Sequence, residues 1–287
     1  IKFKVNQLIS SKKNMSFKRN LGVKKFKSDF VGFLDSDAYP HKNWLKIAYK
    51  FLSKKKNNKT IFGGPSIPFP KQKYTERLSY YAKRSFYVTG YLNFRKYKAP
   101  SRFCDWIESC NMLMNRSLFL NHGGMNTTTY LGEDKEMIAR MKSKDKNVRV
   151  FFTPNLFIYH KERNIKKFLL QRMVFGSDLF NIIKFGNKIN GFQPVLPFLV
   201  SISFTSIIFV KFSLYLKAFI LSAFIMLILL IIFLDIRKYL SSFRDIIMTI
   251  LIIILANLAY VAGNLLAISG LKNLISRKFY IKSRRNE

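Results

Sequence analysis

The segment FVGFLDSDA, residues 30–38, constrains the fold of this chain more than any other. A run of residues typical of a buried β-strand is followed at once by Asp35-Ser36-Asp37. In open α/β sheets, ligands bind at the carboxyl end of such strands. Carboxylate oxygens suit Mg²⁺ or Mn²⁺, which commonly share the phosphates of a substrate. The segment therefore predicts a strand edge that holds a divalent cation against a diphosphate; the alternative is a solvated turn.

Strand and helix patterns alternate around this segment, which predicts an α/β fold. Trp44, Leu45, Ala48, Phe51 and Leu52 recur at helical spacing, and Pro40 is expected to stop the preceding strand. The other expected elements are a helix or turn at 16–27, strands at 30–34, 61–62, 108–114, 148–152 and 156–159, and helices at 116–121 and from Glu133.

Residues 71–100 are basic and rich in tyrosine. We expect a helix followed by a long loop there. Loops of that length are usually functional or disordered. Two interpretations stay open, a lid or acceptor-binding insert and a poorly ordered surface segment.

The charge balance calls for an anionic partner. The net charge is +35, from 50 Lys and Arg against 15 Asp and Glu. Such a balance fits nucleic acid, phospholipid headgroups or phosphorylated substrates, and the apolar C-terminal part favours headgroups over nucleic acid. A biased base composition of the gene is an equally good source of the lysines. Cys104 and Cys110 lack the spacing of a metal motif and are read as reduced, half-buried thiols.

The C-terminal part predicts a membrane region. A basic amphipathic helix over 164–185 reads as interfacial, with a core-packing helix as the alternative. Long apolar runs follow at 195–210, 218–234 and 246–270, and the first is short enough to be re-entrant or monotopic. The basic segment 272–285 is expected in the cytoplasm. A cytoplasmic head and tail need an even number of crossings, so two or three spans remain open.

Several motifs in one order resemble family 2 glycosyltransferases of the GT-A fold. These are SFKRNLGVKKFKSDFVGFLDSDAYPHKNWL, which begins at Ser16, and ESCNMLMNRSLFLNHGGMNTTTYLGEDKEMIARM, which begins at Glu108. The resemblance implies a Rossmann-like nucleotide-diphospho-sugar transferase domain over 1–163. The apolar and basic patterns described above then predict a basic interfacial helix and linker over 164–193, two or three transmembrane helices over 194–270 and a basic cytoplasmic tail over 271–287. The family's first strand and nucleobase loop have no match, and the chain begins at Ile1. We therefore expect an N-terminally incomplete domain, and both an active and an inactive fragment stay open.

The resemblance also implies roles for single residues. Arg19, Asp35 and Ser36 would bind the nucleotide-sugar donor. The metal ligands would be Asp35, Asp37 and His160, with a histidine that merely closes a strand as the less favoured alternative for His160. Asp134 would be the catalytic base, and Glu133 would orient it or the acceptor, although acidic residues in a first helical turn are also favoured by the helix dipole.

These roles predict a membrane-anchored inverting glycosyltransferase of the hexosyltransferase type, dependent on Mg²⁺ or Mn²⁺. It would move a sugar to a lipid-linked or cell-envelope glycan in polysaccharide biosynthesis, with its catalytic head on the cytoplasmic side of a bacterial-type inner membrane bearing anionic phospholipid. The helix around Gln171 lacks the Gln-x-x-Arg-Trp pattern of processive relatives, which favours the addition of one or a few sugars. The alternatives are transfer to a polyprenyl phosphate, a pseudoenzyme, and a non-catalytic basic membrane protein that binds anionic lipid.

Overall fold

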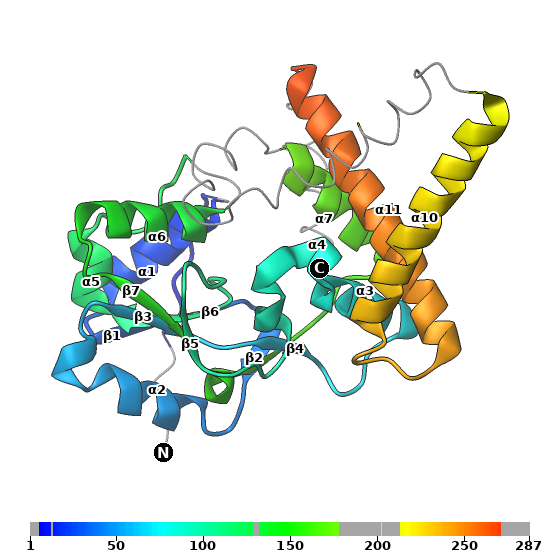
Figure 1. Cartoon of the computed structure of the whole chain (residues 1–287). Helices are drawn as coiled ribbons and strands as arrows, with labels where there is room; N and C mark the ends of the chain where they lie inside the picture. Colours follow the sequence, from blue (N-terminus) through cyan, green and yellow to red (C-terminus); the bar gives the residue numbers. More distant parts are fainter. Residues whose placement is uncertain (1–5, 13, 129–131, 178–201, 203–212, 271–287) are drawn as a thin grey trace. The chain divides into compact units, whose positions relative to one another are not determined.

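The computed structural model describes residues 6–12, 14–128, 132–177, 202 and 213–270 (Figure 1). Backbone contacts divide the chain into two units. The first contains Ile1–Ser66 and Lys98–Tyr159, and the second contains Ile67–Tyr97 and His160–Glu287. The expected first apolar run at 195–210, except for Ile202, and the basic tail lie outside the described residues.

A mixed five-stranded sheet forms the centre of the first unit. Its order is β1-β6-β3-β7-β5, with β3 parallel to β7 and the other pairs antiparallel. The strands are β1 (Phe30–Leu34), β6 (Asn111–Asn115), β3 (Thr60–Gly63), β7 (Arg149–Phe152) and β5 (Arg102–Cys104). A smaller sheet has the order β2-β8-β4, from Ala38–Pro40, Ile158–His160 and Ser66–Pro68. This arrangement confirms the α/β fold class.

Helices of the first unit cover both faces of the five-stranded sheet (Figure 1). The helix α2 (Trp44–Leu52) buries Trp44, Ala48 and Leu52 on one face. The opposite face carries α1 (Met15–Lys25), α5 (Arg116–Asn121) and α6 (Glu133–Lys144). Short 3₁₀ turns lie at Lys55–Asn57 and Pro154–Leu156. In α2 and α6 the buried side chains recur at helical spacing, as the sequence predicted, whereas α1 was expected only as a helix or turn and buries Ser16 and Val23.

Two local expectations for the first unit were wrong. The strand β1 was expected to be buried, but it is an edge strand in which only Phe33 is fully buried. Pro40 was expected to stop a strand, but it ends the separate short strand β2. Proline is tolerated at that place because an edge strand does not need every backbone N–H for its ladder.

The second unit is helical. Its elements are α3 (Tyr74–Arg84), α4 (Phe86–Thr89), the 3₁₀ helix Gly90–Lys96, α7 (Ile165–Ser177), α10 (Leu214–Ile236) and α11 (Phe243–Ile268). The long loop expected within 71–100 was wrong, because most of that segment is helical. Its tyrosines are anchored: the hydroxyl of Tyr80 donates to the carbonyl of Lys96 at 2.6 Å, and that of Tyr74 donates to Asp245 at 3.0 Å.

Two helices of the second unit, α10 and α11, are long and apolar enough to cross a membrane, judged by length and composition. Much of α10 exposes large apolar side chains, including Tyr215, Phe219 and Met226. The facing ends of the two helices are tied to the segment around α3 and α4. Asp235 accepts from the hydroxyl of Ser85 at 2.7 Å, and Asp245 accepts from Tyr74.

The helices α7 and α11 pack through glycines. A Cβ atom at Gly176 would overlap the carbonyl oxygen of Tyr260, and one at Gly263 would overlap that of Met173. Small residues at such a crossing let two helix backbones approach closely. The basic amphipathic helix expected over 164–185 is thus described as far as Ser177, and there it packs against another helix.

We predict that Gly176→Ala destabilises the second unit by about 1–3 kcal/mol, because the added methyl group must displace the α11 backbone. The measurement is thermal unfolding of the purified chain in detergent. The matched control is Gly22→Ala, where a Cβ meets nothing within 4 Å and the helix gains a better former. Equal unfolding temperatures for wild type and Gly176→Ala would contradict the close packing.

Candidate active site

The aspartates of the DSD triplet lie in the turn between β1 and β2. The backbone N–H of Ala38 donates to the carbonyl of Asp35 at 3.1 Å, which closes the turn. Asp35 and Asp37 are half-buried, whereas Ser36 is exposed. The turn begins where β1 leaves the sheet, so the two carboxylates lie at the carboxyl end of a strand as expected.

Arg19 joins two of the predicted carboxylates. One guanidinium nitrogen donates to Oδ1 of Asp35 at 3.0 Å, and the other donates to Oε1 of Glu133 at 3.0 Å. The Arg19 side chain is only 12 % exposed, so both ion pairs are partly shielded from water. The bridge brings together three segments that are far apart in the sequence.

The neighbouring residue Asn20 on α1 has a different role from that of Arg19, because it binds the backbone of Met125. Its amide donates to the carbonyl of Met125 at 2.7 Å, and its Oδ1 accepts from the Met125 N–H at 2.9 Å. Asn20 therefore fixes the loop that precedes α6, while Arg19 reaches the carboxylates.

Asp134 lies in the first turn of α6 and is 8 % exposed. Its Oδ2 accepts from the backbone N–H of Ser109 at 2.9 Å, and its Oδ1 accepts from that of Lys135 at 2.8 Å. Gly132, with φ of +69°, begins the helix in a conformation that favours glycine. The Asp134 carboxylate is thus held in one orientation by two backbone donors, which suits a positioned general base.

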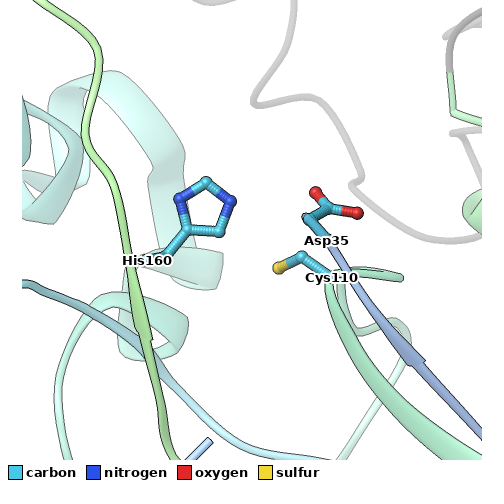
Figure 2. Close-up of side chains that lie close together, drawn as sticks. All are labelled: Asp35, Cys110 and His160. Carbon is cyan, nitrogen blue, oxygen red and sulfur yellow. The ribbon is translucent and has the colours of Figure 1, made fainter. Parts of the chain in front are cut away.

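Cys110 lies beside Asp35, although the sequence around Cys110 indicated no functional role for it. Figure 2 shows the two side chains at the ends of neighbouring strands, and the Asp35 carboxylate and the Cys110 Sγ offer ligand atoms within 4.8 Å of each other. The pairing Leu34↔Asn111 between β1 and β6 places Cys110 opposite Asp35. Only this non-local register reveals the proximity.

Asn111 is a second residue that sequence reasoning missed. Its amide nitrogen donates to the carbonyls of Gly64 at 3.1 Å and Leu156 at 2.6 Å, and its Oδ1 accepts from the indole of Trp44 at 2.9 Å. The side chain is 2 % exposed. It fixes the start of β6, and therefore the backbone next to Cys110. An asparagine inside an apolar strand pattern was the available signal.

His160 is the last residue of β8 and belongs to the second unit. Its Nδ1 lies 2.8 Å from the carbonyl of Lys161, and its own carbonyl accepts from Gln72 at 3.4 Å. Its part in holding a metal or a diphosphate stays a prediction.

The donor set of the first unit fits a divalent cation. Asp35 and Asp37 supply hard oxygen atoms, as Mg²⁺ and Mn²⁺ prefer. Arg19 compensates part of the negative charge, and with Glu133 these four side chains carry a formal charge of −2 when ionised, from one arginine and three carboxylates. Cys110 adds a soft sulfur donor, which also suits Zn²⁺ or Co²⁺.

We predict that Co²⁺ added to the reduced chain gives sulfur-to-cobalt charge-transfer absorption that depends on Cys110. The reason is the short reach from the Cys110 sulfur to the Asp35 carboxylate. The spectrum should persist in Cys104→Ser, whose thiol instead lies near the carbonyl of Trp106, and disappear in Cys110→Ser. Absorption that survives Cys110→Ser would show that the thiol is not a ligand.

Comparison with known proteins shows which family the N-terminal part of the chain resembles. Residues 7–121 match the model of glycosyl transferase family 2. The matched region contains Arg19 and the DSD turn and ends before Glu133, Asp134 and His160. No match was found among curated proteins. The mixed α/β sheets, followed by two apolar helices, agree with a GT-A domain and an α-helical region. Residues 7–121 therefore carry a glycosyl transferase family 2 domain, the family to which the sequence motifs had pointed.

Proposed function

We propose that the chain is a membrane-anchored, inverting glycosyltransferase that takes a sugar from a nucleotide-diphosphate donor. The observation that carries the proposal is the Arg19 bridge, which joins Asp35 of the DSD turn to Glu133 beside Asp134. Residues of the predicted donor site and of the predicted acceptor site thus meet around one guanidinium group. The non-catalytic alternative predicts that Asp35, Asp37 and Asp134 are scattered and solvated. In contrast, Asp35 shares a shielded arginine with Glu133, and Asp134 is buried.

The chain's own side chains suggest how transfer would proceed. Asp134 would accept the proton of the acceptor hydroxyl while the backbone N–H groups of Ser109 and Lys135 hold its carboxylate. Glu133, held by Arg19, would orient the acceptor. Asp35 and Asp37 would hold Mg²⁺ or Mn²⁺, which supplies charge neutralisation for the leaving nucleoside diphosphate. Attack opposite the leaving group predicts inversion at the anomeric carbon.

The membrane part of the proposal depends on α10 and α11. Their length and apolar surface favour anchoring in a bilayer, and the net charge of +35 favours an anionic, cytoplasmic-facing membrane surface. Anchoring beside a bilayer favours a lipid-linked or cell-envelope glycan as acceptor. The absence of the Gln-x-x-Arg-Trp pattern near Gln171 favours the addition of one or a few sugars.

The test is calorimetric titration of the detergent-purified chain with a nucleoside diphosphate and Mn²⁺. We expect binding that is lost with a chelator and weakened about tenfold or more by Asp37→Asn, because the amide removes a charged metal ligand. Asp105→Asn is the matched control, since Asp105 is an exposed aspartate paired with Lys142. Binding that is indifferent to both metal and Asp37 would refute the proposed donor site.

A further inference from the structure

The contact between α7 and α11 contains polar groups in apolar surroundings. The guanidinium of Arg172 on α7 lies over the ring of Tyr260 on α11, with 4.7 Å from Cζ to the ring centroid. One turn further along each helix, Gly176 meets the backbone of Tyr260 and Asn264. Arg172 and Asn264 therefore belong to the same stretch of the helix contact.

Hydrogen-bonding groups of both residues are buried without a partner. Asn264 is 0 % exposed, and neither its Oδ1 nor its Nδ2 has a hydrogen bond within the described ranges. The Nε of Arg172 is likewise buried without an acceptor there. Among the described residues, no carboxylate forms an ion pair with Arg172. Buried polar groups are nearly always hydrogen-bonded, so two orphaned groups at one helix contact call for a missing partner.

The unsatisfied atoms define the chemistry of that partner. Arg172 offers its unsatisfied Nε–H donor and a positive charge, and guanidinium groups commonly bind phosphate. Asn264 offers a further donor from Nδ2. Burial lowers the pKa of Arg172 to about 10, which still leaves the guanidinium charged at neutral pH. The exposed faces of α10 and α11 are apolar, so an anion that reaches this contact from a bilayer would carry a hydrocarbon chain.

We propose that Arg172 and Asn264 form a binding site for a lipid-borne phosphate group at the contact between α7 and α11. The phosphate oxygens would accept from the guanidinium and from the Asn264 amide. A membrane phospholipid and a lipid-linked sugar acceptor both carry such a group. The site stands on contacts of the second unit alone, so it does not depend on sugar transfer by the first unit.

The test measures lipid binding by native mass spectrometry of the full chain in mild detergent. The probes are dioleoyl phosphatidic acid, dioleoylglycerol with the same acyl chains, and inorganic phosphate. We expect saturable binding of phosphatidic acid and much weaker binding of the other two. Arg172→Gln should weaken phosphatidic acid binding by about tenfold or more, because it removes a charge-assisted interaction. Lys166→Gln, an exposed cation on the same helix, is the matched control and should have no effect.

Asn264→Ala gives a readout that a merely structural asparagine would not, because it removes the amide without adding volume to a closely packed contact. Removing an unsatisfied buried amide should change the thermal stability of the lipid-free chain little, while phosphatidic acid binding falls. Equal binding by wild type and Arg172→Gln, equal binding of dioleoylglycerol, or equal loss in Lys166→Gln would each overturn the site. Displacement by a polyprenyl phosphate at lower concentration than by phosphatidic acid would assign it to the acceptor, and the reverse order to a phospholipid. Because no sugar is transferred in this assay, its failure would leave the nucleotide-binding test unaffected.

Discussion

Asp134→Asn should lower the rate of sugar transfer by about 10²–10⁴-fold, because the amide cannot accept the proton of the acceptor hydroxyl. Binding of the nucleoside diphosphate should persist, since Asp35 and Asp37 are unchanged. The measurement is transfer of radiolabelled sugar to membrane lipid extract, together with calorimetry of donor binding. Folded Asp134→Asn with wild-type turnover would refute the role of base and would favour transfer to a polyprenyl phosphate, whose anionic oxygen needs no base.

The same substitution also has a structural cost. Both Asp134 oxygens accept backbone N–H groups, from Ser109 and Lys135, and the amide replaces one acceptor with a donor. Leaving one buried N–H unsatisfied costs about 1–3 kcal/mol. Thermal unfolding must therefore accompany the activity measurement. Asp105→Asn, at an exposed site, should leave both stability and turnover unchanged.

Lys83→Met should destabilise the second unit by about 3–5 kcal/mol, the cost of leaving a buried charge without its partner. Lys83 Nζ lies 2.5 Å from Glu162 Oε2, and the two side chains are only 10 % and 3 % exposed. Loss of the ammonium group removes the hydrogen-bonded partner of the buried Glu162 carboxylate and leaves only the weaker attraction of Lys96 and His160. Thermal unfolding of the detergent-purified chain measures the loss.

A double variant distinguishes the effect of the Lys83–Glu162 ion pair on stability from the effect of side-chain packing. Lys83→Met with Glu162→Gln should recover much of the stability, because no charge then remains buried alone. Lys161→Met, at an exposed lysine next to Glu162, is the control for charge removal and should be neutral. A double variant that is less stable than Lys83→Met would show that the ion pair itself is not the source of the effect.

The Lys83–Glu162 ion pair also makes the stability of the fold depend on pH. Burial alone raises the pKa of Glu162, but the attraction of Lys83 and Lys96 outweighs it and brings that pKa below its ordinary value. A depressed carboxylate pKa stabilises the fold above the unfolded value of about 4.3. That stabilisation should disappear as the pH falls through the lower, folded value.

The sequence predicted those parts of the fold that depend on local patterns. Helix α2, strand β1 and helix α5 lie where apolar spacing and turn residues put them. The helical nature of 86–96 was missed because its stability comes from tertiary partners, such as Asp235, which accepts from the N–H of Phe86. The strand β5 was missed because three residues give too short a pattern.

In the candidate site, likewise, the sequence predicted single residues but not the contacts between them. Asp35, Glu133 and Asp134 could be named from motifs, and the structure joins the first two through Arg19. Arg19 was expected to approach the nucleotide, and that role remains a prediction. Its contact with Glu133 spans 114 positions of sequence, and the proximity of Cys110 to Asp35 depends on the register of two strands. No local pattern encodes either distance.

The hydrogen bonds of Asp235 and Asp245 have a consequence for the orientation of the chain in a bilayer. They hold the end of α10 and the start of α11 against the segment around α3 and α4. If both helices span a membrane, the short turn between them faces the compartment that contains α3. Arg237 and Lys238 in that turn fit a cytoplasmic location. Leu214 and Ile268 then face the opposite compartment, which conflicts with the cytoplasmic location expected for the basic segment that follows Ile268 in the sequence.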